Sequence, residues 1–277
     1  MNSRGRIHFF LALASASIIG VSAQAKLRIL TENWPPISYE EKGAAKGMAV
    51  ELVQAIQKDL GNKSSIEVVP WARGYKLLQT SPNTMLFTLI RNPEREKMFT
   101  MLGPVARGNT TVFSLTKPQR HFKDIEVMKA KATVAVTRGT AFESAARKEE
   151  YKNILDVRDT EMALRLLLAG RVDLICDDSL AIRDALTRLK IDHHEINSVK
   201  ELAEYNLYLG FSPGTDATEI TAWKKSLETL KKNGQFASIY KKWLGEMKPP
   251  SRVEVIYPLD KLQRAAKESS SLHSARN

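Results

Sequence analysis

The sequence predicts an α/β protein composed of two successive units, each a mostly parallel sheet flanked by helices. Short runs of β-favouring residues alternate with segments whose apolar residues recur at helical spacing. Such alternation is typical of strand–helix–strand units in which the strands run parallel. A β-rich run at residues 110–117 ends the first series of elements, and a second series follows it without any internal repeat.

The first unit is expected to contain three strands, each followed by a helix. Gly61 marks the end of the first helix, because glycine readily adopts the left-handed conformation that terminates helices. Pro93 suits the first turn of the third helix, where its missing N–H group is not needed. The strands are expected at residues 26–30, 65–69 and 84–90, and the helices at 48–60, 72–79 and 93–99.

The second unit continues the alternation, and two further helices follow it. Asp216, with Glu219 three residues later, forms a capping pattern at the start of the first of these helices, and Gly234 separates the two. From residue 249 onward the chain is rich in Pro, Ser and Lys, so we expect 249–277 to be a poorly ordered tail. The strands are expected at 132–136, 153–157, 171–176 and 205–212, and the helices between them at 140–151, 159–170 and 178–189.

Residues 1–25 have the three regions of a secretory signal peptide. Arg4 and Arg6 supply a positively charged start, residues 9–21 are apolar, and Ala23-Gln24-Ala25 has the small residues of a cleavage site. We therefore expect cleavage after Ala25 and a mature protein in the periplasm. No later segment reaches the roughly 18 apolar residues that a membrane helix requires.

Charge and cysteine content narrow the classes of function. The formal net charge is +11, but Lys and Arg are dispersed among acidic residues and no nucleic-acid-binding motif is present, so we expect no nucleic-acid partner. The single cysteine, Cys176, excludes an internal disulfide. The segment 192–195, "DHHE", has metal-binding residue types, but adjacent histidines on a strand point to opposite faces, so we expect no metal and no cofactor.

Charged and aromatic side chains collect where the predicted strands end. In open parallel sheets, ligands bind outside the carboxyl ends of the strands. Arginine binds a carboxylate through two hydrogen bonds, a helix N-terminus offers free N–H groups, and aspartate pairs with an ammonium group. The combination suits a small zwitterion or organic acid in a cleft between the two units. The candidate ligand-binding residues are Glu32, Trp34, Trp71, Arg73, Arg91, Arg95, Gly139, Thr140 and Asp178.

Several of these residues also have a purely structural interpretation. Arg95 could pair with a surface carboxylate, and Asp178 could cap the helix that follows it. Gly139 could serve only a turn, and Trp71 could belong to the core. These alternatives stay open in the sequence, and the joint placement of the residues at strand ends is what favours a binding site.

Residues 26–247 resemble the family 3 bacterial extracellular solute-binding proteins, the periplasmic receptors of ABC importers for polar amino acids and related compounds. The resemblance rests on "ENWPPISYEEKGAAKGMAVELVQAI", "NPERE", "TRGTAFE", "AGRVDLICDD" and "LKKNGQFASIYKKWLG". It implies a two-lobed type II periplasmic-binding-protein fold with two crossing strands. Lobe I would comprise residues 26–115 and 210–248, and lobe II residues 116–209.

The resemblance also implies roles for individual residues. Arg95 would bind a ligand carboxylate together with the helix start at Gly139-Thr140, and Asp178 would accept the ligand's amine. Trp34 and Trp71 would form opposite walls of the pocket.

The chain departs from the family pattern in two ways. Ile90 stands where the amino-acid binders usually have Ser or Thr, and Arg91 and Arg73 are additional cations. These departures favour a more acidic ligand than a standard α-amino acid.

Two functions are consistent with this resemblance. The first is a monomeric, non-catalytic binding protein that delivers its small-molecule ligand to the membrane permease of an ABC importer. The second is an exported lyase, since some relatives resemble cyclohexadienyl dehydratases, and Glu32 is the carboxyl at the first strand end that could act as general acid. No motif demands catalysis, so we expect a binding protein and not an enzyme.

Overall fold

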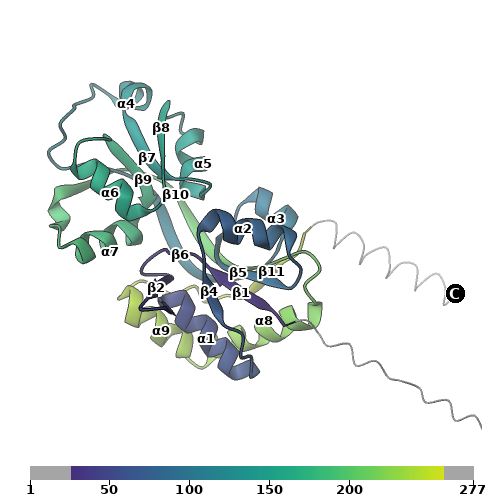
Figure 1. The fold of residues 1–277 in the computed structure, drawn as a ribbon. Helices are drawn as coiled ribbons and strands as arrows, with labels where there is room; N and C mark the ends of the chain where they lie inside the picture. The colour runs from purple at the N-terminus through teal and green to yellow at the C-terminus, as the bar shows by residue number, and fades with distance from the viewer. Residues whose placement is uncertain (1–25, 259–277) are drawn as a thin grey trace, which may run out of the picture.

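A computed structural model describes residues 26–258. The predicted signal peptide and the last part of the predicted tail, from residue 259, lie outside the described residues. Figure 1 shows two lobes joined by a pair of long strands. The structure therefore has the two-lobed architecture that the family resemblance implied.

One lobe is built from both ends of the described chain. Its elements are β1 (Arg28–Thr31), β2 (Tyr39–Glu41), β3 (Ala44–Lys46), α1 (Met48–Leu60), β4 (Ile66–Val68), α2 (Trp71–Thr80), β5 (Thr84–Ile90), α3 (Pro93–Met98), α8 (Ala217–Lys232), α9 (Gln235–Leu244) and β11 (Glu254–Ile256). Helix α1 and strand β5 have the bounds predicted from the sequence. Gly61 adopts the left-handed conformation at the end of α1, and Pro93 occupies the first turn of α3. We call this part lobe I.

The other lobe is formed by the middle of the chain. Its elements are α4 (Ile125–Lys131), β7 (Thr133–Thr137), α5 (Ala141–Lys148), β8 (Asn153–Val157), α6 (Thr160–Leu168), β9 (Leu174–Asp178), α7 (Ser179–Leu189) and the short 3-10 helix η1 (His193–Glu195). We call this part lobe II. The predicted divisions between the lobes, after residues 115 and 209, stay a prediction.

A single sheet runs through both lobes in the order β4-β1-β5-β10-β6-β9-β7-β8, with β11 paired to β6. The outer strands of each lobe are parallel, and the crossing strands β6 (Thr100–Leu115) and β10 (Ile196–Phe211) are antiparallel to each other. Parallel strands end at the same edge of a sheet, so the ends of β1, β5, β7 and β9 turn toward the junction of the lobes.

Both crossing strands are longer than the sequence indicated. Residues 110–117 and 205–212 were predicted, whereas β6 begins at Thr100 and β10 at Ile196. Gly103, Pro104 and Gly108 interrupt the β-favouring pattern in the first half of β6, and the first half of β10 is mostly exposed and polar. Pairing between the two strands holds these weak segments extended.

The prediction of a poorly ordered tail from residue 249 is wrong for Glu254–Ile256, which form strand β11. Strand β11 pairs with β6, and the Glu254 carboxylate accepts a hydrogen bond from the Tyr208 hydroxyl at 2.5 Å. Val253 and Val255 alternate with charged residues and pack against the core, which is the period-2 pattern of a short strand. This segment therefore adds a strand at the edge of lobe I.

Each lobe has an apolar core beneath its helices. In lobe I, Trp223 of α8 lies edge-on against Phe211 of β10, and both are fully buried. In lobe II, Leu164 and Leu186 from α6 and α7 pack in the same cluster as Ile175 of β9. Within residues 26–258, no helix combines the length and apolar character needed to cross a bilayer.

Candidate functional site

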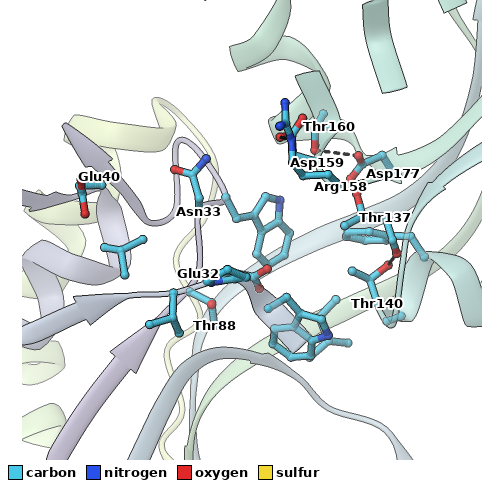
Figure 2. Close-up of a pocket in the computed structure, with 18 of the residues that line it drawn as sticks. Glu32, Asn33, Glu40, Thr88, Thr137, Thr140, Arg158, Asp159, Thr160 and Asp177 are labelled. Atoms are coloured by element: carbon cyan, nitrogen blue, oxygen red, sulfur yellow. Dashed lines mark hydrogen bonds and ion pairs between the residues drawn. The ribbon is translucent and has the colours of Figure 1, made fainter. Parts of the chain in front are cut away.

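The junction of the lobes contains a cavity with a volume of about 390 Å³. Figure 2 shows Glu32 and Thr88 on the lobe I side, facing Thr137, Thr140, Thr160 and Asp177 of lobe II. Lining side chains come from Glu32, Asn33, Trp34, Glu40, Val68, Val69, Pro70, Trp71, Thr88, Ile90, Arg95, Thr137, Thr140, Ala141, Phe142, Arg158, Asp159, Thr160 and Asp177. The volume and the mixture of aromatic walls with a few charged groups are typical of small-molecule sites.

Arg95 is the lobe I cation of the cavity. The Asn92 side chain caps α3 by accepting a hydrogen bond from the Arg95 N–H at 2.8 Å, which fixes the start of this helix. The Arg95 side chain is 5% exposed, and its Nη1 donates to the Ile90 carbonyl at 2.8 Å. Burial lowers the pKa of the guanidinium, although the Tyr75 hydroxyl and Glu32 act in the opposite direction. No carboxylate in the described part of the chain forms an ion pair with it.

Trp71 covers Arg95 and reaches across to lobe II. The guanidinium carbon of Arg95 lies 4.9 Å from the centre of the Trp71 ring, within the range of a cation–π contact. Tyr75 stacks on Trp71 with ring centres 5.4 Å apart. The Trp71 indole Nε1 donates a hydrogen bond to the Gly139 carbonyl at 2.8 Å. A lobe I side chain is thereby bonded to the backbone at the start of α5.

Trp34 makes a second aromatic contact between the lobes. Its ring lies edge-on to Phe142 of α5, with centres 5.8 Å apart, and 6.2 Å from the ring centre of Tyr205. The Trp34 indole Nε1 is buried and has no hydrogen-bond partner among the described residues. Both tryptophans therefore contact the beginning of the same lobe II helix.

Two carboxyl groups of the cavity have raised pKa values. Burial raises the pKa of Glu32 from 4.5 to about 8, although Arg95 acts to lower it, and Asp177 raises it further. Burial also raises the pKa of Asp177 from 3.8 to about 7, against the stabilising hydrogen bonds from the Asp178 N–H and the Thr160 hydroxyl. Glu32 retains partial solvent exposure, whereas Asp177 is 1% exposed. A low-dielectric environment favours the neutral form of each acid.

Asp178 is enclosed behind the cavity wall. Its Oδ1 accepts hydrogen bonds from the N–H groups of Leu180 and Ala181 at 3.0 Å each, so it caps α7. The Tyr205 hydroxyl donates to its Oδ2 at 2.5 Å. This contact depends on Gly108, because a Cβ atom there would lie 2.2 Å from the Tyr205 hydroxyl. The capping interpretation left open by the sequence is thus present in the structure.

The structure brings five of the nine candidate residues into the cavity wall: Glu32, Trp34, Trp71, Arg95 and Thr140. Gly139 lies beside them and contributes its carbonyl to Trp71. Asp178, Arg73 and Arg91 are not part of the wall.

The two additional arginines, Arg73 and Arg91, lie outside the cavity wall. Arg73 is exposed on α2, and Arg91 forms ion pairs with Glu96 at 2.5 Å and Glu254 at 3.3 Å. The expectation of a more acidic ligand rested on these two cations, and neither contributes charge to the cavity wall.

Sequence reasoning missed several lining residues. Asp177 was noted only as a neighbour of Asp178. Thr160 was not noted, although it begins α6 shortly after a predicted strand, where a ligand-binding side chain could be expected. Thr88 sits inside the apolar strand β5 with a φ of 71°. A β-branched residue rarely adopts this left-handed conformation. Such backbone strain is typical of functional positions, and Thr88 lines the cavity. Thr137, Ala141 and Phe142, which also line the cavity, lay inside the motif "TRGTAFE".

Within residues 26–258, no group of three or more His, Cys, Asp or Glu side chains is arranged to hold a metal ion. His193 and His194, weighed as metal ligands from the sequence, lie in η1, and His193 Nε2 is 3.1 Å from the Thr187 hydroxyl.

Two lobes joined by paired crossing strands around a charged, aromatic-walled cavity define the type II periplasmic-binding-protein fold. Residues 27–246 match the family described as bacterial extracellular solute-binding proteins, family 3, and the chain belongs to this family. Proteins of this family bind small molecules such as amino acids.

Named relatives agree with this assignment. The arginine-binding periplasmic protein of Mannheimia haemolytica is 25% identical over 234 residues, which cover 81% of this chain and 94% of that protein. The L-cystine-binding protein TcyA of Bacillus subtilis (strain 168) is 24% identical over 231 residues, covering 82% of this chain and 84% of the relative. Both names describe binding proteins and not enzymes.

A solved structure with the same fold is that of the ancestral amino acid-binding protein AncCDT-1, a precursor of cyclohexadienyl dehydratase. The TM-score is 0.67 and the identity 24%, over 79% of this chain and 95% of that one. Similarity at this level shows the fold alone.

Proposed function

We propose that the protein captures a small polar ligand bearing a carboxylate in the interlobe cavity and delivers it to the permease of an ABC importer. The observation that carries the proposal is the Arg95 guanidinium, which is buried without a carboxylate partner in residues 26–258. A buried cation without a counter-charge is unfavourable, so a ligand carboxylate would stabilise it. The planar guanidinium also matches a carboxylate through two parallel hydrogen bonds.

The start of α5 supplies a second binding element for the ligand carboxylate. Ala141 and Phe142, the first two residues of this helix, line the cavity. N–H groups of a first helical turn have no acceptor within the helix, and the helix dipole favours a negative charge beside them. Arg95 from lobe I and the start of α5 from lobe II could therefore hold one carboxylate between them.

Changing Arg95 tests the proposal. Arg95→Ala should weaken the binding of a carboxylate ligand by about 2–5 kcal/mol, because it leaves a desolvated carboxylate unpaired. Arg95→Lys should restore only part of this loss, since an ammonium group lacks the planar fork. The ligand can be identified by thermal-shift screening, because a bound ligand stabilises the native state by mass action, and affinities then follow by calorimetry.

Arg73→Ala is the matched control, because Arg73 is an exposed arginine outside the cavity wall. It should bind like the wild type. Wild-type affinity in Arg95→Ala would show that the carboxylate lies elsewhere. Delivery is tested separately, by uptake of the bound ligand into membrane vesicles that carry the permease.

A lyase remains the second candidate, and Glu32 is the observation that favours it. Its raised pKa of about 8 keeps the carboxyl protonated at neutral pH, as a general acid requires. Incubation with prephenate or arogenate distinguishes the two functions. Turnover that Glu32→Gln abolishes would establish the lyase, whereas binding without turnover supports the binding protein.

A further inference from the structure

Residues 252–256, which we call the strap, close one edge of the lobe I sheet. Their strand β11 pairs antiparallel with the lobe I end of β6. Lys231 of α8 holds the beginning of the strap, because its Nζ donates hydrogen bonds to the Arg252 carbonyl at 2.6 Å and to the Pro104 carbonyl of β6 at 2.7 Å. The strap is thereby fixed to α8 and β6 before the chain reaches Glu254.

Glu254 is the centre of a polar network that joins the strap to three other strands. Its Oε1 accepts hydrogen bonds from the Tyr208 hydroxyl of β10 at 2.5 Å and from Nη1 of Arg91 at 3.3 Å. The Tyr208 ring lies over Gly103, the β6 residue paired with Glu254, where a Cβ atom would be 2.8 Å from the ring. One carboxylate of the strap therefore connects β6, β10 and the residue that directly follows β5.

Arg91 continues this network to the segment that carries Arg95. Its Nε pairs with the Glu96 carboxylate of α3 at 2.5 Å, and its backbone N–H donates to the Asn206 carbonyl of β10 at 3.2 Å. The carbonyl of Ile90, the preceding residue, accepts the hydrogen bond from Nη1 of Arg95 at 2.8 Å. Arg91 is therefore bonded to the residue after Arg95 and adjacent to the residue whose carbonyl orients the Arg95 side chain.

The apolar side of the strap supports the aromatic residues around Arg95. Ile256 and Tyr75 both pack against the buried cluster that contains Trp71 and Tyr208. The ring centres of Trp71 and Tyr75 lie 4.9 and 5.4 Å from the guanidinium carbon of Arg95. The polar and the apolar contacts of the strap thus both lead to groups that surround Arg95.

Covering the edge of a sheet does not by itself require charged side chains, because strands pair through backbone groups. The Arg91 and Glu254 side chains are 36% and 28% exposed, and single ion pairs with this exposure add little to global stability. Several linked charges do fix a local geometry, and a binding residue depends on such support from residues outside its site. Glu254 is not part of the cavity wall.

We propose that Glu254 is a positioning residue for the ligand site: through Arg91 it holds residues 90–96, so that the Arg95 guanidinium is kept in the orientation that binds a carboxylate. Ordering this side chain in advance lowers the free-energy cost of binding. The inference rests on the proposed function, in which Arg95 binds the ligand carboxylate. It gives the strap a role in ligand affinity from outside the cavity.

Hydrogen exchange, followed by NMR on the ligand-free protein, tests the link between the strap and α3. Glu254→Gln retains an acceptor for Tyr208 but loses the charge that pairs with Arg91. The amide of Arg95, whose N–H is bonded to the Asn92 side chain, should then exchange about threefold faster or more, since α3 opens more readily. Unchanged exchange at Arg95 would overturn the inference.

Two further variants complete the exchange experiment. Arg91→Gln removes the same ion pair from its other partner, so it should give the result of Glu254→Gln and decides the question even if that variant does not fold. Glu228→Gln is the matched control, because Glu228 pairs with Lys224 at 2.5 Å on α8 of the same lobe and takes no part in the network of Glu254. Equal acceleration in the control would indicate a general loss of lobe I stability and overturn the inference.

Calorimetry then tests the effect on binding, with L-arginine, L-glutamine, L-glutamate and L-cystine as probes. Glu254→Gln should weaken the best-bound probe about three- to tenfold, the cost of ordering one side chain on binding. In an Arg95→Lys background the same change should have little effect, because an ammonium group has no planar fork to orient. Equal losses in both backgrounds would show that Glu254 does not act through Arg95.

The outcomes separate the inference from the function on which it rests. If Arg95→Ala loses binding while Glu254→Gln does not, the carboxylate site holds and only the role of the strap is wrong. If Arg95→Ala binds like the wild type, the proposed carboxylate site fails and the inference fails with it. If none of the four probes binds, the exchange measurement alone decides the role of the strap.

Discussion

At the end of β1, Glu32 is a carboxyl group that burial keeps protonated near neutral pH. It faces Arg95 from α3, Asp177 from β9 and Tyr205 from β10. Its pKa rises on folding from 4.5 to about 8, so between these pH values the native state holds a proton that the unfolded state has released. Stability contributed by this group is therefore full below about pH 4.5 and is lost as the pH rises toward 8.

Glu32→Gln removes this titration, and we expect the variant to gain stability relative to the wild type as the pH rises from 5 to about 8.5. Denaturant unfolding of the ligand-free proteins at several pH values measures the difference. Glu40→Gln is the control, because it replaces an exposed acid of the same cavity wall. A difference between Glu32→Gln and wild type that stays constant with pH would contradict the raised pKa.

Single residues also mark the limit of what the sequence could predict about the site. Asp177 and Asp178 are adjacent acids at one strand end, and only the packing of β9 against β6 decides which of them faces the cavity. Arg91 follows β5 directly, and of its two ion-pair partners one, Glu96, is nearby in the sequence while the other, Glu254, lies 163 positions further along the chain. Local pattern identifies the kind of side chain at a strand end, but such long-range partners decide its role.

At the scale of elements, the start of α5 is where lobe I and lobe II meet. Trp71 bonds to the Gly139 carbonyl, and Trp34 packs on Phe142 one turn along. Trp71→Phe keeps a ring over Arg95 but removes the donor to Gly139. We expect it to weaken ligand binding by about 0.5–1.5 kcal/mol, through faster dissociation, with little change in the stability of the ligand-free protein.

Stopped-flow dissociation measures this effect, and lobe I offers a matched control. Trp243 of α9 also donates from Nε1, to the Glu51 carboxylate at 2.7 Å, at a position outside the cavity wall. Trp243→Phe therefore loses a comparable hydrogen bond without touching the junction of the lobes. Equal dissociation rates for Trp71→Phe and the wild type would show that the bond to Gly139 does not help to close the cleft.

The predicted helices and strands were correct where the local sequence pattern alone specifies the structure. Helix α1 has apolar residues at helical spacing and a terminal glycine, and β5 is a continuous buried run, so both have the predicted bounds. Strand β11 and the outer halves of β6 and β10 were missed, because pairing with a distant partner stabilises them more than their own composition does. The hairpin β2–β3, in the polar segment after "ENWPP", was missed for a different reason: its two strands are three residues long, mostly exposed and polar, and pair only with each other.

For the whole molecule, the arrangement of the lobes determines how a ligand would be held. Lobe I contributes Arg95 and Glu32 to the cavity, and lobe II contributes Thr140 and Asp177. Both pairs of residues can contact one small ligand only when the two lobes approach each other. The crossing strands β6 and β10 are the connections that would bend during such an approach, and their pairing is interrupted by register shifts at three places along its length.

We therefore predict that ligand binding shifts the protein toward a closed form with a smaller radius of gyration. A ligand shifts a conformational equilibrium only by binding one form more tightly, and the closed form alone offers contacts from both lobes. Small-angle scattering with and without a saturating ligand measures the change. Arg95→Ala, at the same ligand concentration, should retain the larger radius because its ligand is not bound. An unchanged radius in the saturated wild type would mean that the lobes are already closed without ligand, held by Trp71 and Trp34 against α5.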